Sequence, residues 1–182
     1  MPHQLKKLQE AYTYRIINSP ENYFVYTDAI LLGSLQKKHR HSRYILIEIM
    51  EHQYQLETFG FINPVISITN IVTKELIGKI KISAFARLLP KVFFEFNNTR
   101  FRWVKKSIFS LHWQWKKGET TIIEVIEKFE VGEQKGVIVL SDHFREANLL
   151  IMVGLYLRNN IKVLSLKKLT HSKTEKASLA NS

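Results

Sequence analysis

The side chains in this sequence that are best suited to binding chemistry are cations. They gather in three stretches: Lys37, Lys38, Arg40 and Arg43 in one basic run, Lys79 and Lys81 in a second stretch, and Arg100 and Arg102 in a third. Arginine binds phosphate groups through paired hydrogen bonds, and lysine binds them as a point charge. These stretches therefore predict sites for phosphate-bearing partners. For the first run, a solvated hairpin tip is the alternative.

In the other two stretches the cations alternate with large apolar residues. Lys79 and Lys81 alternate with Ile80, and Arg100 and Arg102 flank Phe101. Period-two alternation is typical of a strand with one wet and one buried face. We therefore expect a cationic stripe on an outer wall. The same spacing predicts that Trp103 and its aromatic neighbours belong to a core and are not platforms for stacking bases.

Residue types that support catalysis are present but poorly arranged. Ser141, Asp142 and His143 are adjacent, whereas the fold brings the members of a triad together from separate segments. A helix cap at Ser141 or Asp142 is the better interpretation. Two further pairs of carboxylates, Glu48 with Glu51 and Glu124 with Glu127, are each three residues apart. That spacing puts the partners on opposite faces of a strand and predicts solvated positions or edge charges. We predict no catalytic residues and favour a protein that is not an enzyme.

Metal and cofactor chemistry is also not expected. The chain has no cysteine, and its seven histidines form no H-x-x-x-H or H-E-x-x-H pair. No phosphate-binding loop or dinucleotide-binding glycine pattern is present. We predict neither a bound metal nor a cofactor.

Composition indicates one folded domain with a basic surface. The chain has 182 residues, 45% of them hydrophobic, and a formal net charge of +11. Such a charge attracts nucleic acid, anionic lipid or acidic proteins. The N-terminus, MPHQLKKLQEAY, lacks the apolar core of a signal peptide. The longest apolar run, Leu149–Leu157, is shorter than the ~20 residues that span a bilayer. We expect no transmembrane span and a cytoplasmic protein, peripheral at the membrane surface.

Most of the chain shows strand signals. Alternating or β-branched segments at 12–17, 23–26, 29–35, 43–50, 53–59, 64–72, 76–83, 92–96, 99–104, 108–115, 120–129 and 137–140 predict about ten to twelve strands in a meander of close turns. Asn97-Asn98 and Lys117-Gly118-Glu119 are turn signals. We expect a segment at 1–11, a barrel domain at 12–168 that includes a short strand at 161–166, and a polar, disordered tail at 169–182.

One helix is expected, at about 142–159. Its centre, Leu149 to Leu157, is apolar on every side, so it must be buried on every side. A flat sheet covers only one face of a helix, whereas many strands closed into a barrel cover its whole circumference and leave no exposed edge. The sequence therefore predicts a mainly β protein, a closed and mostly antiparallel barrel around a hydrophobic helix. Gly154 would be tolerated in the helix where a wall side chain approaches closely.

The strand-rich order, the aromatic strands around Phe101, Trp103, Trp113 and Trp115, and the late helix EANLLIMVGLYL resemble the tubby C-terminal superfamily. That superfamily includes the phospholipid scramblases and the LURP-one-related proteins. The resemblance covers most of residues 12–166 and implies binding of anionic lipid headgroups such as phosphoinositides. The chain lacks the cysteine cluster and proline-rich segment of typical scramblases, so lipid scrambling is not implied.

Three hypotheses follow for the function. The first is a non-catalytic domain that recognises anionic lipid headgroups or acts as a membrane-surface adaptor. The second is a nucleic-acid-binding barrel, which exposed aromatics between arginines would favour. The third is an enzyme or small-ligand binder with an unrecognised pocket, although a helix that fills the barrel would occupy the natural cavity.

Overall fold

The fold is a single closed sheet. A computed structural model describes residues 10–18, 22–27, 30–37, 44–60, 63–83, 91–105, 107, 110–130, 133–141 and 146–160. The strands are β1 (Glu10–Asn18), β2 (Asn22–Thr27), β3 (Ile30–Lys37), β4 (Tyr44–Ile49), β5 (His52–Phe59), β6 (Val65–Asn70), β7 (Leu76–Ser83), β8 (Lys91–Phe96), β9 (Thr99–Lys105), β10 (His112–Lys117), β11 (Thr120–Glu130) and β12 (Glu133–Leu140).

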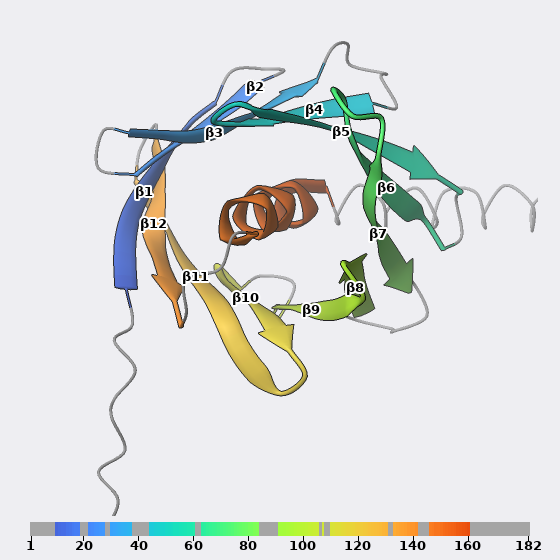
Figure 1. The fold of residues 1–182 in the computed structure, drawn as a ribbon. Coiled ribbons are helices and arrows are strands. Elements are labelled where there is room, and N and C mark those ends of the chain that lie inside the picture. The colour runs from blue at the N-terminus through green and yellow to red at the C-terminus, as the bar shows by residue number, and fades with distance from the viewer. Residues whose placement is uncertain are drawn as a thin grey trace, which may run out of the picture.

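The strands close into a barrel in chain order. Each strand pairs antiparallel with the next, and β1 closes the ring by pairing with β12, with Tyr14 opposite Gly136. One helix, residues 147–160, lies inside the ring (Figure 1). The predicted mainly β barrel around a hydrophobic helix is confirmed.

Alternation along each strand explains why this sequence forms a barrel. On β7, Ile80 and Ile82 are buried while Lys79 and Lys81 are exposed, so one face meets the core and the other meets solvent. Two of the tight turns occur where residues tolerate positive φ. Asn97 and Asn98 have φ of 44° and 56°, and Gly118 has φ of 59°, as the turn signals predicted.

The helix is buried as its sequence requires. Residues 149–157 are all buried, because the barrel wall surrounds them. At Gly154, side chains of the barrel wall come very close to the helix backbone. A Cβ there would lie 2.5 Å from Cη2 of Trp113 and 2.9 Å from Nε1 of Trp115. The Trp115 indole N–H donates to the main-chain carbonyl of Leu150, 2.7 Å away. The predicted reason for tolerating this glycine is confirmed.

The start of the helix differs from the prediction. The described helix begins at 147, and the Ser141 hydroxyl donates to the carbonyl of Thr121 on β11 at 2.8 Å. An N-cap side chain must accept a bond from its own helix, so the prediction of a cap at Ser141 is wrong: this serine directly follows β12 and bonds to β11. Asp142, the short strand at 161–166 and the tail at 169–182 lie outside the described residues.

No helix among the described residues is long and apolar enough to cross a membrane.

Candidate anion-binding surface

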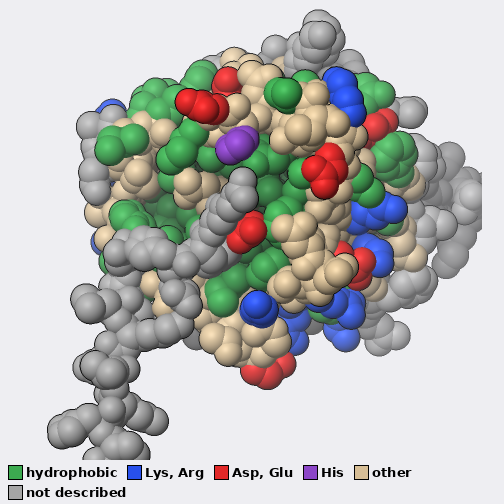
Figure 2. Space-filling model, viewed as in Figure 1, with side chains coloured by type: hydrophobic (Ala, Val, Ile, Leu, Met, Phe, Trp, Pro, Cys, Tyr) green, Lys and Arg blue, Asp and Glu red, His purple; other side chains and the backbone are tan. Residues whose placement is uncertain are grey.

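Four of the predicted cations lie together on the outer wall of β7 to β9. Two rows of side chains cross these strands. In one row, Glu95 of β8 lies opposite both Lys79 and Arg100. In the other, Phe93 lies opposite both Lys81 and Arg102, and Arg102 also lies opposite Lys116 of β10. In Figure 2, Lys and Arg side chains gather at the lower right, where Figure 1 places β7 to β10.

Short-range contacts organise this wall. The Lys81 ammonium lies 2.7 Å from Oε2 of Glu95, and the Arg100 guanidinium stacks 3.9 Å from the centroid of the Phe93 ring. Arg102 contacts Glu119 at 3.3 Å through Nη2, while its buried Nε has no hydrogen-bond partner among the described residues. Lys79 makes no ion pair within the part of the chain that the structure describes. The wall thus presents an excess of cationic donors over carboxylates.

The cations around Glu95 change the pKa of its carboxyl group. The pKa of Glu95 is lowered, chiefly by the hydrogen bond from Lys81. Burial opposes this shift, and the positive charges of Lys81, Arg100 and Lys79 add to it. Cations that stabilise one carboxylate also attract a phosphate. The sequence interpretation missed the contribution of β8, although the alternation of Val92 and Phe94 with Phe93 and Glu95 places the latter two on the outer face.

The other predicted site is not part of this wall. Lys37 ends β3, and three strands separate β3 from β7, the nearest strand of the wall. Lys38, Arg40 and Arg43 lie outside the described residues. Lys37, the one described residue of the basic run, is therefore not part of the wall, and a single headgroup cannot contact both Lys37 and the wall.

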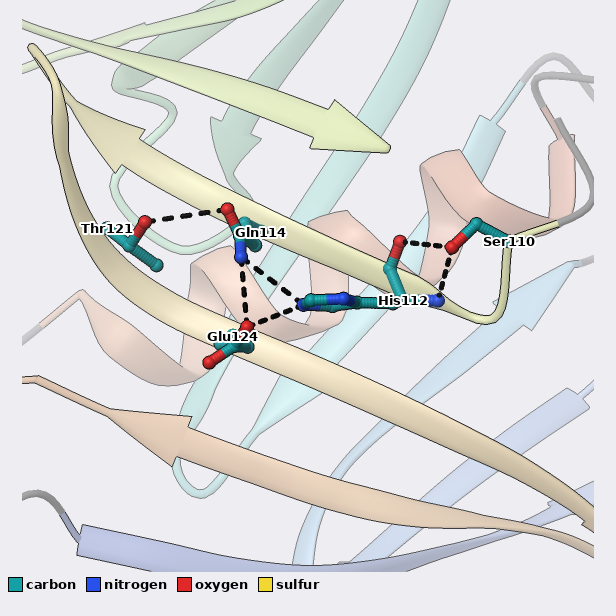
Figure 3. Close-up of polar contacts among 5 residues, drawn as sticks. All are labelled: Ser110, His112, Gln114, Thr121 and Glu124. Atoms are coloured by element: carbon teal, nitrogen blue, oxygen red, sulfur yellow. Dashed lines mark hydrogen bonds and ion pairs between the residues drawn. The ribbon is translucent and has the colours of Figure 1, made fainter. Parts of the chain in front are cut away.

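A polar cluster on and beside β10 and β11 contains residue types that occur in catalytic sites (Figure 3). Nε2 of His112 lies 2.6 Å from Oε1 of Glu124, and the Gln114 amide donates to the same oxygen at 2.9 Å. The Thr121 hydroxyl donates to Oε1 of Gln114 at 3.4 Å. Ser110, the other hydroxyl of the cluster, accepts a bond from the main-chain N–H of His112 and donates to the carbonyl of His112. Its hydroxyl is therefore engaged with main chain and not with a base, so the cluster lacks an activated nucleophile.

The other chemical candidates give no site in the described part of the chain. No group of three or more potential metal ligands occurs among the described residues. Of the adjacent Ser141, Asp142 and His143, only Ser141 is described, and its hydroxyl bonds β11.

The interior holds an unexpected charged group, Glu127. Its Oε1 accepts a bond from Trp113 Nε1 at 2.8 Å, and its Oε2 accepts from Gln134 at 3.1 Å and lies 2.7 Å from Nη2 of Arg158. Arg158 is in the last turn of the helix, where a cation also suits the helix dipole. This network ties the end of the helix to β10, β11 and β12.

The prediction that Glu127 is solvated is wrong, although the predicted opposite faces are correct. Glu124 faces outward to His112, and Glu127 is buried. Ile123, Val125 and Glu127 follow one another at period two, so they share the inner face. This signal was present in the sequence, whereas Arg158 as the partner was not.

Tyr14 lies beside this network. Its ring packs over Gly136, where a Cβ would come within 2.8 Å of Cζ of the ring. Its buried hydroxyl has no hydrogen-bond partner among the described residues. Burial, followed by the negative charge of Glu127, raises the pKa of Tyr14, and Arg158 acts in the opposite direction.

Comparison of the chain with protein-family models, curated proteins and solved structures returns no match.

Proposed function

We propose that this protein is a non-catalytic barrel of the tubby-like type that binds anionic phospholipid headgroups, such as phosphoinositides, through the outer wall of β7 to β10. One observation carries the proposal: Lys79, Lys81, Arg100 and Arg102 lie on one face, joined by Lys116. Cations so arranged suit a phosphate better than isolated surface charges do. The helix-filled barrel supports a binding surface on the outside over a pocket inside.

Liposome co-sedimentation tests this function. Binding should increase with the content of phosphatidylserine or phosphoinositide and fall steeply with salt. Each cation near an anionic membrane contributes ~1 kcal/mol, so changing Lys79, Lys81, Arg100 and Arg102 together to Gln should weaken binding by about 100-fold or more at low salt.

The basic run provides a control of equal charge. A variant with Lys37, Lys38, Arg40 and Arg43 all changed to Gln loses the same four charges elsewhere. It should retain most of the binding. If this variant loses binding and the wall variant does not, the site belongs to the run and the wall proposal is wrong.

Nucleic-acid binding has one observation in its favour. Phe93 faces outward between arginines, with Arg100 stacked on it, whereas Trp103, Trp113 and Trp115 are buried and unable to stack on bases. Full displacement of the protein from vesicles by single-stranded oligonucleotide, with tighter binding of the oligonucleotide than of lipid, would favour this second function.

A further inference from the structure

One rim of the barrel carries exposed apolar side chains at the tips of three neighbouring hairpins. Ile30 at the β2–β3 tip, Met50 at the β4–β5 tip and Val72 at the β6–β7 tip are 72%, 74% and 76% exposed. Leu31 and Leu76 are exposed beside the first and third of these tips. Because the strands follow chain order around the barrel, the three tips lie side by side along the same rim.

Met50 is an unusual residue for its position. It has φ of 52°, in the left-handed region that Gly and Asn adopt at low cost. Two other hairpin tips of the same rim obey that preference, with Asn97-Asn98 between β8 and β9 and Gly118 between β10 and β11, whereas at the β6–β7 tip Lys74 has φ of 59°. At the β4–β5 tip the chain instead places a large, exposed apolar side chain in a strained conformation, which points to a role for that side chain.

The apolar tips continue directly into the cationic wall. Leu76 follows the β6–β7 tip and is three residues before Lys79 on β7. An open groove of about 520 Å³ lies between the start of β7 and the β8–β9 tip, lined by apolar Leu76 and Phe96, by basic Lys79 and Arg100, and by Glu95, which pairs with Lys81. Its apolar and basic side chains match the two parts of an anionic phospholipid at a membrane interface.

We infer that this rim is the membrane-facing end of the barrel. Ile30, Met50 and Val72 enter the boundary between headgroups and acyl chains, while Lys79 and Arg100 contact anionic headgroups. The inference rests on the proposed function and adds the orientation of the barrel and a hydrophobic component of binding. Separate protruding tips suit a deformable bilayer, whereas a protein partner needs a contiguous complementary patch. Glu51 and Glu75 at the same tips oppose binding and limit its strength.

The first test removes the apolar tips without changing charge. Changing Ile30, Met50 and Val72 together to Ser should weaken binding to vesicles of phosphatidylcholine and phosphatidylserine roughly 100-fold, from the apolar area no longer buried. The loss should persist in high salt, unlike that of the wall variant. A matched control changes Ile17, Phe59 and Ile126 to Ser, which are exposed apolar residues away from these tips. The control should bind like the unmodified protein.

The second test measures depth. The chain has no cysteine, so Met50→Cys or Val72→Cys carries a single environment-sensitive fluorophore. With anionic vesicles, its emission should shift to the blue and be quenched by lipids brominated on their acyl chains. The same label on Ile126→Cys should show neither change.

The outcomes separate the two proposals. If the protein binds anionic vesicles but the tip variant binds equally well and the label at 50 stays in water, the orientation is wrong and the headgroup function stands. If the unmodified protein does not bind anionic vesicles, both proposals fail. If the tip variant alters the oligomeric state in sedimentation velocity, the rim is a contact between copies of this chain, and the membrane inference is wrong.

Discussion

Two ion pairs of equal length, one inside the barrel and one on its outer wall, contribute differently to the protein. Arg158 and Glu127 are 2.7 Å apart, as are Lys81 and Glu95. The Glu127 side chain is 0% exposed and that of Glu95 is 43% exposed. Distance alone therefore says little about the contribution of an ion pair, because solvent screens the outer pair and not the inner one.

The difference assigns separate roles to the pairs. Glu127 receives further bonds from Trp113 and Gln134, and removal of any donor leaves a carboxylate that cannot reach water. The inner pair thus fastens the helix end to the wall. Water can easily replace Lys81 as the partner of the outer carboxylate, Glu95, and this carboxylate competes with an arriving phosphate for Lys81.

Breaking the inner pair should have the largest effect. Arg158→Leu leaves the Glu127 charge buried without its cation and should destabilise the protein by ~3–5 kcal/mol. Urea denaturation followed by circular dichroism measures this loss. A double variant, Arg158→Leu with Glu127→Leu, should be less destabilised than the sum of the single variants. Strict additivity would show that the two groups do not interact.

Filling the space at Gly154 should have the next largest effect. Gly154→Ala gains ~1 kcal/mol of helix propensity but collides with Trp113 and Trp115, so we expect a net loss of ~1–2 kcal/mol. Asn159→Ala, in the last turn of the same helix, changes propensity without this collision and removes only the bond that Asn159 Oδ1 accepts from Arg158. A lower thermal midpoint for Gly154→Ala alone would confirm the close approach, and a higher midpoint would contradict it.

Replacing each of two interior tyrosines with phenylalanine should change the stability of the protein in opposite directions. The Tyr14 hydroxyl has no partner among the described residues, so Tyr14→Phe should raise stability by ~0.5–1 kcal/mol. The Tyr156 hydroxyl is hydrogen-bonded to Thr58, so Tyr156→Phe should lower it by a similar amount. Equal changes in the free energy of unfolding for the two substitutions, measured by urea denaturation, would contradict this prediction.

The same tyrosines predict alkaline sensitivity. Burial raises the pKa of both Tyr14 and Tyr156 in the folded state. Above pH ~10 the unfolded chain loses these protons while the folded chain keeps them, so stability should fall as pH rises. Removing either phenol should flatten this fall in denaturation measured from pH 9 to 11.

Changing the outer pair should have the smallest effect on stability. Glu95→Gln removes a solvent-exposed carboxylate, and its unfolding midpoint at pH 7 should match that of the unmodified protein. Because the pKa of Glu95 is lowered, any contribution is present above the ordinary glutamate pKa and is lost as pH falls below it. The same variant should bind anionic vesicles more tightly, since one repulsive charge is gone. Weaker binding would indicate that Glu95 organises the wall.

Much of the architecture could be predicted because it depends on local periodicity. Alternation on β7 and β9 indicates which cations face outward, and the all-apolar run 149–157 requires enclosure. The same rule, applied to Ile123, Val125 and Glu127, would have identified the buried carboxylate. The interpretation failed there because glutamate is rarely buried without a partner, and the partner, Arg158, is distant in sequence.

The sequence by itself determined the strand pattern, the turns, the buried helix and the outward direction of the cations. These depend on side chains within a few residues of each other. Only the tertiary structure decided that β8 inserts Phe93 and Glu95 between the cations of β7 and those of β9, and that Lys37 lies far around the barrel from these cations. It also decided that Arg158 meets Glu127 and that the apolar tips share one rim. Those relations depend on strand register and barrel closure, which join residues far apart in the chain.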